Sequence, residues 1–448
     1  MQVIKKHKLL VAIYLIFTLV IVLLSIIKVP YDITSPAYIN KIDTVIEIDD
    51  SASNSGSFHT VSVYSYERVS VLQYLFALCD RKTTVSKTYQ QINLSNVQQR
   101  ASGTIQKNVS IVNSLIAGYE AAKRYGADCN ISYHLEGYIV DRVYNYLSTN
   151  TLEIGDIITS INGVSLKDNL IDDALNIVGS TDSYDLVVKR DNEEKSFTIT
   201  KNDYINSNGN TSYGFGFAGY DYFVIDEAYP SFTINKANTY GPSGGLLQSL
   251  MVFNSLYKDV DLTNGLKIVG TGTIDFTGDV GEIGGMYQKV LCAEMSDVDI
   301  FIAPVERRQG YDYSYIGISS NNTWMIGNYD SNITATVDNI PYILNGLWYI
   351  GDVDTRYMAY GSIIQFYDES TLQDETNFLE GYRAYKTLNN TKMDYVPVAT
   401  LDDAINYFFT IQNRTDILKK TQNAYNLYLN NNENVSVEEW MERVTRWN

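Results

Sequence analysis

The sequence contains few of the residues from which common metal, redox and histidine-dependent sites are built. It has three cysteines, three histidines and seven prolines among 448 residues. The cysteines are odd in number and far apart, so they form neither a disulfide framework nor a C-x-x-C metal or redox motif. His7, His59 and His134 are isolated from one another, which excludes an H-E-x-x-H metal site and a Ser-His-Asp triad. The sequence therefore predicts no metal ion and no organic cofactor.

Basic residues are also scarce, with 34 Lys and Arg against 52 Asp and Glu, a formal charge of -18 and an isoelectric point near 4.6. A surface this acidic repels phosphate backbones, which argues against a general nucleic-acid binder. The hydrophobic share of 45% excludes a disordered, collagenous or disulfide-stapled chain. At about 100 to 200 residues per domain, the length predicts two or three domains, each with its own core.

One long hydrophobic run lies at the N-terminus. Leu9 to Ile27 carries no charge, and at about 1.5 Å per residue such a helix crosses a hydrocarbon core of about 30 Å. Three lysines precede the run and Lys28 follows it. The positive-inside rule then predicts a cytoplasmic segment 1–8, a single membrane span 9–27 and an extracytoplasmic remainder. A cleaved signal peptide is the alternative, but the run exceeds the usual ~7–15 apolar residues and no clear A-x-A site follows it.

The stretch that follows the apolar run, residues 28–130, has mixed patterns. Thr60 to Tyr66 alternates in the period-2 manner of a strand, while Val109 to Lys123 repeats apolar residues at helical spacing. We interpret this stretch as a membrane-proximal part of the main body. Together with the segments below, it predicts a multidomain α+β chain.

Residues 131–201 have the pattern of a compact module. Gly137 to Val143 is a predicted strand opened by a glycine, and Leu152 to Gly163 is a turn, a strand and an Asn-Gly turn. Asp172 to Val178 follows as a short helix, and a hairpin across Asp191-Asn192 completes the module. The predicted order is strand, strand, helix, hairpin.

This order and its glycines resemble a PDZ domain, a β-sandwich or barrel with a short helix. The resemblance implies capture of a peptide by strand addition. It also implies that a loop formed by Leu135, Glu136, Gly137 and Tyr138 offers backbone N–H groups to a terminal carboxylate. Glu136 is acidic where a carboxylate would approach, so an internal or unstructured segment is the alternative ligand.

Residues 231–306 hold the pattern most typical of catalysis. Ser231 to Asn235 is a predicted strand, Gly241-Pro242 breaks it, and apolar residues repeat at helical spacing from Leu246. Ser243 is therefore predicted at a helix N-terminus. There, unpaired backbone N–H groups and the helix dipole stabilise an oxyanion. The alternative is that Ser243 is only a helix N-cap.

A lysine lies in the first turn of a second predicted helix. Lys267 to Asp275 is a predicted strand, Gly281 to Gly285 a glycine-rich corner, and Met286 to Met295 a helix that carries Lys289. Helix N-termini favour anions and burial favours a neutral amine, so the pKa of Lys289 is predicted to fall below its usual value of about 10.4. A desolvated lysine beside a serine can act as a general base for acyl transfer.

These segments resemble the proteolytic domain of the Lon family. Gly241 to Gly245 matches its nucleophile motif, Gly270 to Asp275 its central strand, and Gly281 to Gly285 its corner. Lys289 matches its catalytic lysine. Gly244 stands where the commonest family spelling has alanine.

The resemblance implies a role for five residues. Ser243 is the nucleophile, Lys289 the general base, and Thr271 the residue that hydrogen-bonds the lysine amine. Backbone N–H groups at Gly241 and Gly244 hold the oxyanion. No G-x-x-x-x-G-K-[ST] motif occurs in the sequence, so peptide bonds would be cleaved without ATP.

Taken as a whole, the sequence resembles the membrane-anchored PDZ-Lon proteases of Gram-positive bacteria. The resemblance implies a Lon-like domain over 202–410, closed by a strand and helix near 396–407. An insertion at about 307–375 is longer than the family's, and we interpret it as an accessory subdomain, with a lid or an aromatic binding wall as the alternative. Residues 411–448 form a predicted C-terminal helical appendage.

The predicted function is an ATP-independent serine endopeptidase that cleaves extracytoplasmic peptides or protein segments. The alternative is a non-catalytic peptide-binding scaffold with a decayed Lon-like domain, and Ser243 and Lys289 are both present, which favours the enzyme. A third possibility is a signal-peptidase-like enzyme, which shares the catalytic pair of serine and lysine but lacks the Gly-Pro-Ser turn and the glycine-rich corner. The predicted partners are a peptide or protein substrate and the membrane, without nucleic acid or ATP. The sequence does not decide whether the chain forms a homo-oligomer, as Lon domains often do.

Overall fold

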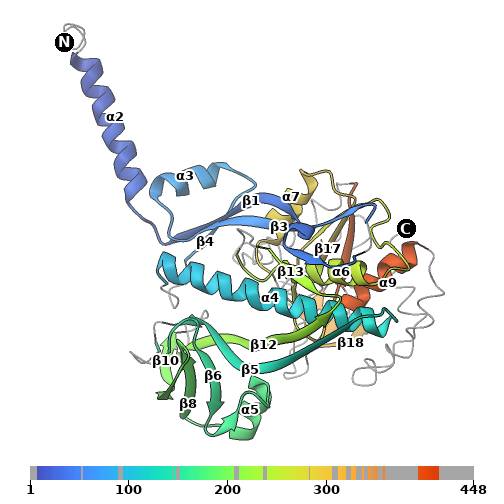
Figure 1. Cartoon of the computed structure of the whole chain (residues 1–448). Helices are drawn as coiled ribbons and strands as arrows, with labels where there is room; N and C mark the ends of the chain where they lie inside the picture. Colours follow the sequence, from blue (N-terminus) through green and yellow to red (C-terminus); the bar gives the residue numbers. More distant parts are fainter. Residues whose placement is uncertain are drawn as a thin grey trace.

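The computed structural model shows an N-terminal helix that projects from a body of two larger β-sheets and several helices (Figure 1). It describes residues 8–412 except 52–53, 89–93, 145, 148–151, 206–210, 236–239, 282 and 305–310, and between 319 and 391 it describes only short strands. The predictions for the insertion at 307–375 lie largely outside the described residues. The predicted appendage lies almost wholly outside them.

The projecting helix, α2 (Lys8–Ile26), is long and apolar enough to span a membrane. Its window Leu9–Ile26 has a mean hydropathy of 3.1, and none of this window is buried by the rest of the protein. The predicted N-terminal apolar helix is therefore present, and the rest of the described chain does not cover it.

The first sheet combines strands from both halves of the chain, in the order β24-β17-β14-β3-β1-β4. Its strands are β1 (Tyr31–Lys41), β3 (Ser57–Tyr66), β4 (Thr84–Lys87), β14 (Lys267–Gly270), β17 (Ile300–Pro304) and β24 (Asp394–Val398). Strand β14 runs parallel to both β3 and β17, whereas β1 is antiparallel to β3 and β4. Strands from the stretch 28–130 thus share one sheet with strands from the second half of the chain.

Four helices surround this sheet and the turn that leads to Ser243. They are α4 (Asn96–Arg124), α6 (Gly245–Leu256), α7 (Met286–Glu294) and α9 (Leu401–Ile411). A capping box at Ser95 and Gln98 fixes the start of α4, and a second at Thr400 and Asp403 fixes the start of α9. The predicted helices at 109–123 and 286–295 are present, and α4 is longer than predicted.

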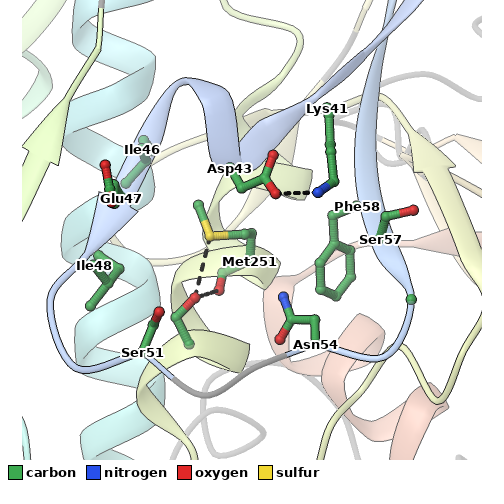
Figure 2. Close-up of a pocket in the computed structure, with 12 residues that line it drawn as sticks. Lys41, Asp43, Ile46, Glu47, Ile48, Ser51, Asn54, Ser57, Phe58 and Met251 are labelled. Carbon is green, nitrogen blue, oxygen red and sulfur yellow. Dashed lines mark hydrogen bonds and ion pairs between the residues drawn. The ribbon is translucent and has the colours of Figure 1, made fainter.

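Helix α6 also borders a cavity of about 210 Å³ (Figure 2). Met251 and Ser255, in the C-terminal half of the helix, line it together with Phe58 of β3. The side-chain amide of Asn54, another lining residue, already accepts a hydrogen bond from Asn254 at 2.7 Å. The cavity therefore lies near the end of α6 opposite Ser243, which precedes its first turn.

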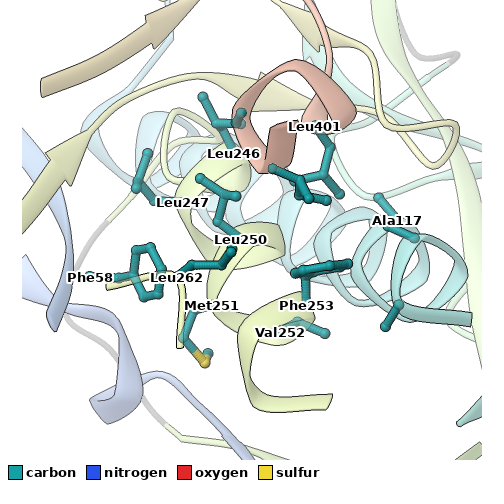
Figure 3. Close-up of a cluster of buried hydrophobic side chains, with 14 of the residues drawn as sticks. Phe58, Ala117, Leu246, Leu247, Leu250, Met251, Val252, Phe253, Leu262 and Leu401 are labelled. Carbon is teal, nitrogen blue, oxygen red and sulfur yellow. The ribbon is translucent and has the colours of Figure 1, made fainter. Parts of the chain in front are cut away.

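Helix α6 is the centre of the main hydrophobic core. Every residue from Gly245 to Leu256 is buried. Leu250 and Phe253 lie among side chains of β3, α4 and α9, including Phe58, Ala117 and Leu401 (Figure 3). The hydrophobic residues of α6 therefore exceed a single stripe, and its buried polar residues Ser249, Asn254 and Ser255 form hydrogen bonds.

The second sheet has the order β12-β5-β6-β8-β9, with β7 paired to β6. Its elements are β5 (Asn130–Val143), β6 (Ile157–Ile161), β7 (Val164–Ser165), β8 (Ser183–Arg190), β9 (Glu193–Thr200), β12 (Phe217–Tyr229) and the helix α5 (Ile171–Val178). The predicted order of strand, strand, helix and hairpin is present, and Asp191 and Asn192 have the positive φ angles of a tight hairpin turn. The long pairing of β5 with β12 was not predicted.

The remaining elements are short. They are η1 (Ile42–Thr44), β2 (Ile46–Ile48), α3 (Val71–Cys79), β10 (Asn202–Ile205), β11 (Thr211–Gly214), β13 (Phe232–Ile234), β15 (Thr273–Ile274), β16 (Val280–Gly281), β18 (Tyr311–Ile318), β19 (Trp324–Asn328), β20 (Ala335–Val337), β21 (Tyr342–Leu344), β22 (Leu347–Ile350) and β23 (Tyr357–Met358). The strand predicted over Lys267 to Asp275 is wrong in one respect, because β14 ends at Gly270 and β15 begins only at Thr273.

Truncation of Phe253 tests the position of α6 in the core. We expect Phe253→Ala to lower the free energy of unfolding by about 3–5 kcal/mol, because it removes a fully buried ring and leaves a cavity. Ile177→Ala on α5 is the control, since Ile177 is 63% exposed and such changes stay within about 0.5 kcal/mol. Chemical denaturation of the full chain in detergent measures both, and equal effects would contradict the buried position of Phe253.

Candidate active site

Ser243 lies in the turn before α6, and its side chain does not cap the helix. Gly241 opens the turn with a φ of 87°, and Gly244 is the N-cap of α6 without a side-chain capping bond. The hydroxyl of Ser243 forms no hydrogen bond with any described residue. The alternative that Ser243 serves as the N-cap is therefore not supported.

The long helix α4 fixes this turn from one side. The amide of Gly241 donates to the carbonyl of Gly103 at 3.0 Å, and Ser110 Oγ donates to the carbonyl of Pro242 at 2.8 Å. Neither Gly103 nor Ser110 was identified from the sequence, because they lie more than a hundred residues before Ser243 and belong to no motif. Their contacts hold the backbone on the N-terminal side of Ser243.

The loop between β14 and β15 fixes the turn from the other side. The carbonyl of Ser243 accepts a hydrogen bond from the amide of Gly272 at 2.8 Å and another from Thr271 Oγ1 at 3.1 Å. These contacts coincide with the interruption of the predicted long strand. The amide of Thr271 still donates to the carbonyl of Ile302 in β17 at 2.9 Å, whereas the amide of Gly272 turns toward Ser243. Thr271 is fully buried.

Lys289 reaches the same place from α7. Its side chain is only 3% exposed, and its Nζ donates to Thr271 Oγ1 at 2.9 Å. The hydrogen bond that the family resemblance implied is thus present. Thr271 joins the two predicted dyad residues, since its hydroxyl accepts from Lys289 and donates to the carbonyl of Ser243. No direct hydrogen bond links Ser243 Oγ to Lys289 Nζ, although the structure describes both residues.

Burial controls the charge of Lys289. Among the described residues, no carboxylate forms an ion pair with its amine. Burial in apolar surroundings disfavours the ammonium form and lowers the pKa of Lys289 to about 7. Near neutral pH a substantial fraction of this amine therefore carries no proton and is able to accept one.

The predicted oxyanion site needs one correction. The amide of Gly241 is already bonded to Gly103, so it is unavailable to a substrate. Within the described chain, the amides of Ser243 and Gly244 have no acceptor and lie at the positive end of α6. Glycine also suits position 244 sterically, because an alanine methyl there would lie 3.0 Å from Thr60 Cγ2.

The predicted peptide-binding loop is wrong. The residues assigned to it belong to the continuous strand β5: Leu135, Glu136, Gly137 and Tyr138. Strand β12 pairs with β5 from Asn130 to Val143, with a register shift at Glu136, and β6 pairs with Tyr138 from the other side. The carboxylate of Glu136 accepts a hydrogen bond from Lys189 at 2.8 Å, which is the main cause of its lowered pKa. This backbone is thus engaged in the sheet instead of being open to a terminal carboxylate.

Strand β12 occupies the position in which a captured peptide strand was expected. It runs antiparallel to β5, and Asp221 in its middle accepts a hydrogen bond at 2.9 Å from the amide of Ile171, the first residue of α5. A segment of the same chain therefore supplies both the added strand and a carboxylate at the helix N-terminus. The sheet ends at β9 on its other side.

Comparison with known proteins adds no family assignment. No protein-family model matches this chain, and no curated protein matches it at a significant level. The resemblances to the Lon and PDZ families therefore rest on the sequence motifs alone.

Replacing Lys289 tests its burial as an amine. We expect Lys289→Met to raise the free energy of unfolding below pH 7 by a few kcal/mol, because each unit of pKa depression corresponds to about 1.4 kcal/mol. The pKa of Lys289 is lower in the folded state than in the unfolded state, so below about pH 7 the parent bears the whole free-energy cost of burying the ammonium. This cost disappears as the pH approaches the unfolded pKa of about 10.4, and the gain should disappear with it.

Denaturant titrations of the full chain at pH 5.5, 7 and 9 measure this gain. Lys258→Met is the matched control, since Lys258 is exposed and should show no such pH-dependent gain. A gain from Lys289→Met that does not change with pH would contradict the lowered pKa.

Proposed function

We propose that this chain is a membrane-anchored serine endopeptidase that uses Ser243 as the nucleophile, Lys289 as the general base and no ATP. The observation that carries the proposal is the buried Lys289 amine with a pKa of about 7, held through Thr271 beside the turn of Ser243. A lysine with a purely structural role is normally exposed or paired with a carboxylate. Lys289 is neither, within the part of the chain that the structure describes.

The first chemical step is the attack of Ser243 Oγ on the scissile carbonyl carbon. Neutral Lys289 takes the hydroxyl proton as the new C–O bond forms. The substrate-free structure has no direct bond between the two groups, and such catalytic hydrogen bonds commonly tighten only in the substrate complex. Because the Ser243 hydroxyl has no other partner among the described residues, it can turn toward the amine.

The negative charge of the tetrahedral intermediate falls on the former carbonyl oxygen. The free amides of Ser243 and Gly244 are the donors we assign to it, assisted by the dipole of α6. Lys289 then returns the proton to the leaving amine, and water hydrolyses the acyl-enzyme by the same exchange. Thr271 orients the amine by accepting one of its hydrogens throughout.

The proposed location follows from α2. With α2 across the membrane and the lysines before it in the cytoplasm, the body from Tyr31 onward lies on the extracytoplasmic side. The absence of a nucleotide-binding motif fits that side, and substrates would be peptides or unfolded segments rather than folded proteins that need ATP-driven unfolding.

The sheet of β5, β6, β8 and β9 with α5 is the proposed PDZ-like module. Peptide capture beside residues 135–138 is not part of the proposal, because β12 fills that edge. If the module captures peptides, the open edge at β9 (Glu193–Thr200) is where a further strand would add.

Peptide cleavage by the full chain in detergent or vesicles tests the activity. An unstructured peptide library should be cut by the parent, with products identified by mass spectrometry. Ser243→Ala, Lys289→Ala and Lys289→Arg should each reduce the cleavage rate by at least about 10³-fold. The first two remove the nucleophile or the base, and the third fails because a guanidinium does not release its proton. Lys258→Arg, at an exposed lysine, is the matched control and should cleave normally.

Two results would count against the proposal. Normal cleavage by Lys289→Arg would disprove the general-base role. A folded parent that cuts none of the peptides would favour the non-catalytic scaffold.

The pH dependence tests the role of Thr271. We expect kcat/KM to rise with an apparent pKa near 7 as Lys289 loses its proton, and to level off above it. Thr271→Val removes an acceptor that stabilises the ammonium, so the apparent pKa should fall further and kcat should drop by about 10–100-fold with little change in KM. Thr271→Ser keeps the hydroxyl and should restore both values. A Thr271→Val profile identical to that of the parent would exclude the positioning role.

A further inference from the structure

Helix α3 (Val71–Cys79) carries an apolar face that the described chain does not cover. Leu72, Leu75, Phe76 and Cys79 recur at the i, i+3, i+4, i+7 spacing of one helix face. Leu75 and Phe76 are 48% and 67% exposed, and the neighbouring Leu78 is 59% exposed. Three large apolar side chains on a nine-residue helix mark a contact surface rather than scattered surface hydrophobics.

The opposite face of α3 fixes the helix in this orientation. Ala77 is buried, and Tyr74 packs with it against Ile33 and Val69 of the body. Ser70 and Gln73 form a complete capping box at the N-terminus of α3. The exposed apolar face therefore cannot turn inward without losing these contacts.

The start of α3 is attached directly to the end of α2. The amide of Val71 donates to the carbonyl of Ile27 at 2.9 Å, and the amide of Val29 donates to the carbonyl of Val69 at 2.9 Å. The two helices are in contact, and Figure 1 shows α3 lying crosswise at the base of α2. A helix so placed must lie at the surface of any bilayer that α2 crosses.

Cations flank α3 although the whole chain has a formal charge of -18. Lys28 lies at its N-terminal end, and Arg81 and Lys82 follow the C-cap residue Asp80 at its C-terminal end. None of these three forms an ion pair with a carboxylate of the described chain. Apolar residues on one face with basic residues at the ends are typical of a helix that lies in a membrane interface containing anionic lipids.

We propose that α3 is a second, interfacial membrane contact, with Leu75, Phe76 and Leu78 among the upper acyl chains of the bilayer that α2 spans. Lys28, Arg81 and Lys82 lie at the level of the anionic headgroups. The proposal concerns how the body is held rather than the peptidase reaction, and it rests on α2 crossing the membrane. Two attachment points fix the orientation of the body, which a single span leaves free to rotate.

Fluorescence quenching on the full chain tests this contact. Cys79 is exposed while Cys129 and Cys292 are buried, so a thiol-reactive environment-sensitive dye labels α3 selectively. The labelled protein is reconstituted in phosphatidylcholine–phosphatidylglycerol vesicles, and flotation shows that α2 is inserted. We expect quenching by lipids brominated high in the acyl chain to be at least about twofold stronger at Cys79 than at the control position. The control is a Cys79→Ser, Glu194→Cys chain labelled on the distant strand β9.

Two further variants exclude an effect of the dye itself. Leu75→Glu with Phe76→Glu should abolish the bromolipid quenching at Cys79 while peptide cleavage in solution stays unchanged. Strong iodide quenching at Cys79 in floated protein, equal to that of the control, would overturn the proposal. Shielding from iodide without bromolipid quenching would also overturn it, because a protein surface such as a second copy would then cover α3. Failure of the full chain to float with the vesicles would overturn the proposal as well, because it rests on α2 crossing the membrane.

Discussion

The arrangement around Ser243, Thr271 and Lys289 depends on a single electrostatic constraint, the burial of the Lys289 amine without an anionic partner among the described residues. An ammonium in that position is unstable, so the folded protein shifts the group toward its neutral form, with a pKa of about 7. A carboxylate beside the amine would stabilise the fold near neutral pH but would keep the proton on the lysine. Thr271, a neutral acceptor, orients the amine without supplying that charge.

The turn of Ser243 is held by parts of the chain that are distant in sequence. Helix α4 contacts it through Gly103 and Ser110, while the same helix reaches the second sheet through Gln106, whose amide donates to the carboxylate of Asp141 at 2.6 Å. Burial raises the pKa of Asp141. The second sheet thus supports helix α4, and α4 supports the turn of Ser243, which gives the sheet a structural role whether or not it captures a peptide.

The sequence predicted the parts of this structure that local pattern controls. The apolar helix α2, the helix behind Ser243 and the Asp191-Asn192 hairpin follow from hydrophobic period and turn residues. The partners of these segments could not be predicted in the same way. The pairing of β12 with β5, and the contact of Ser110 with Pro242, join residues more than seventy positions apart. Gly137 was predicted to lie in a loop, because the neighbouring sequence does not show that β12 will pair with it.

The strand order of the first sheet affects when the protein can fold relative to its synthesis. Its central strands β3 and β14 lie more than two hundred positions apart, and β24, at residues 394–398, completes the edge beside β17. Contacts this distant in sequence close late and slowly. Ser243 and Lys289 are synthesised well before β24 and α9, yet the core around α6 includes Leu401. A chain still being synthesised would thus carry both Ser243 and Lys289 in an unfinished fold, and the core around α6 would be complete only once nearly the whole body had been made.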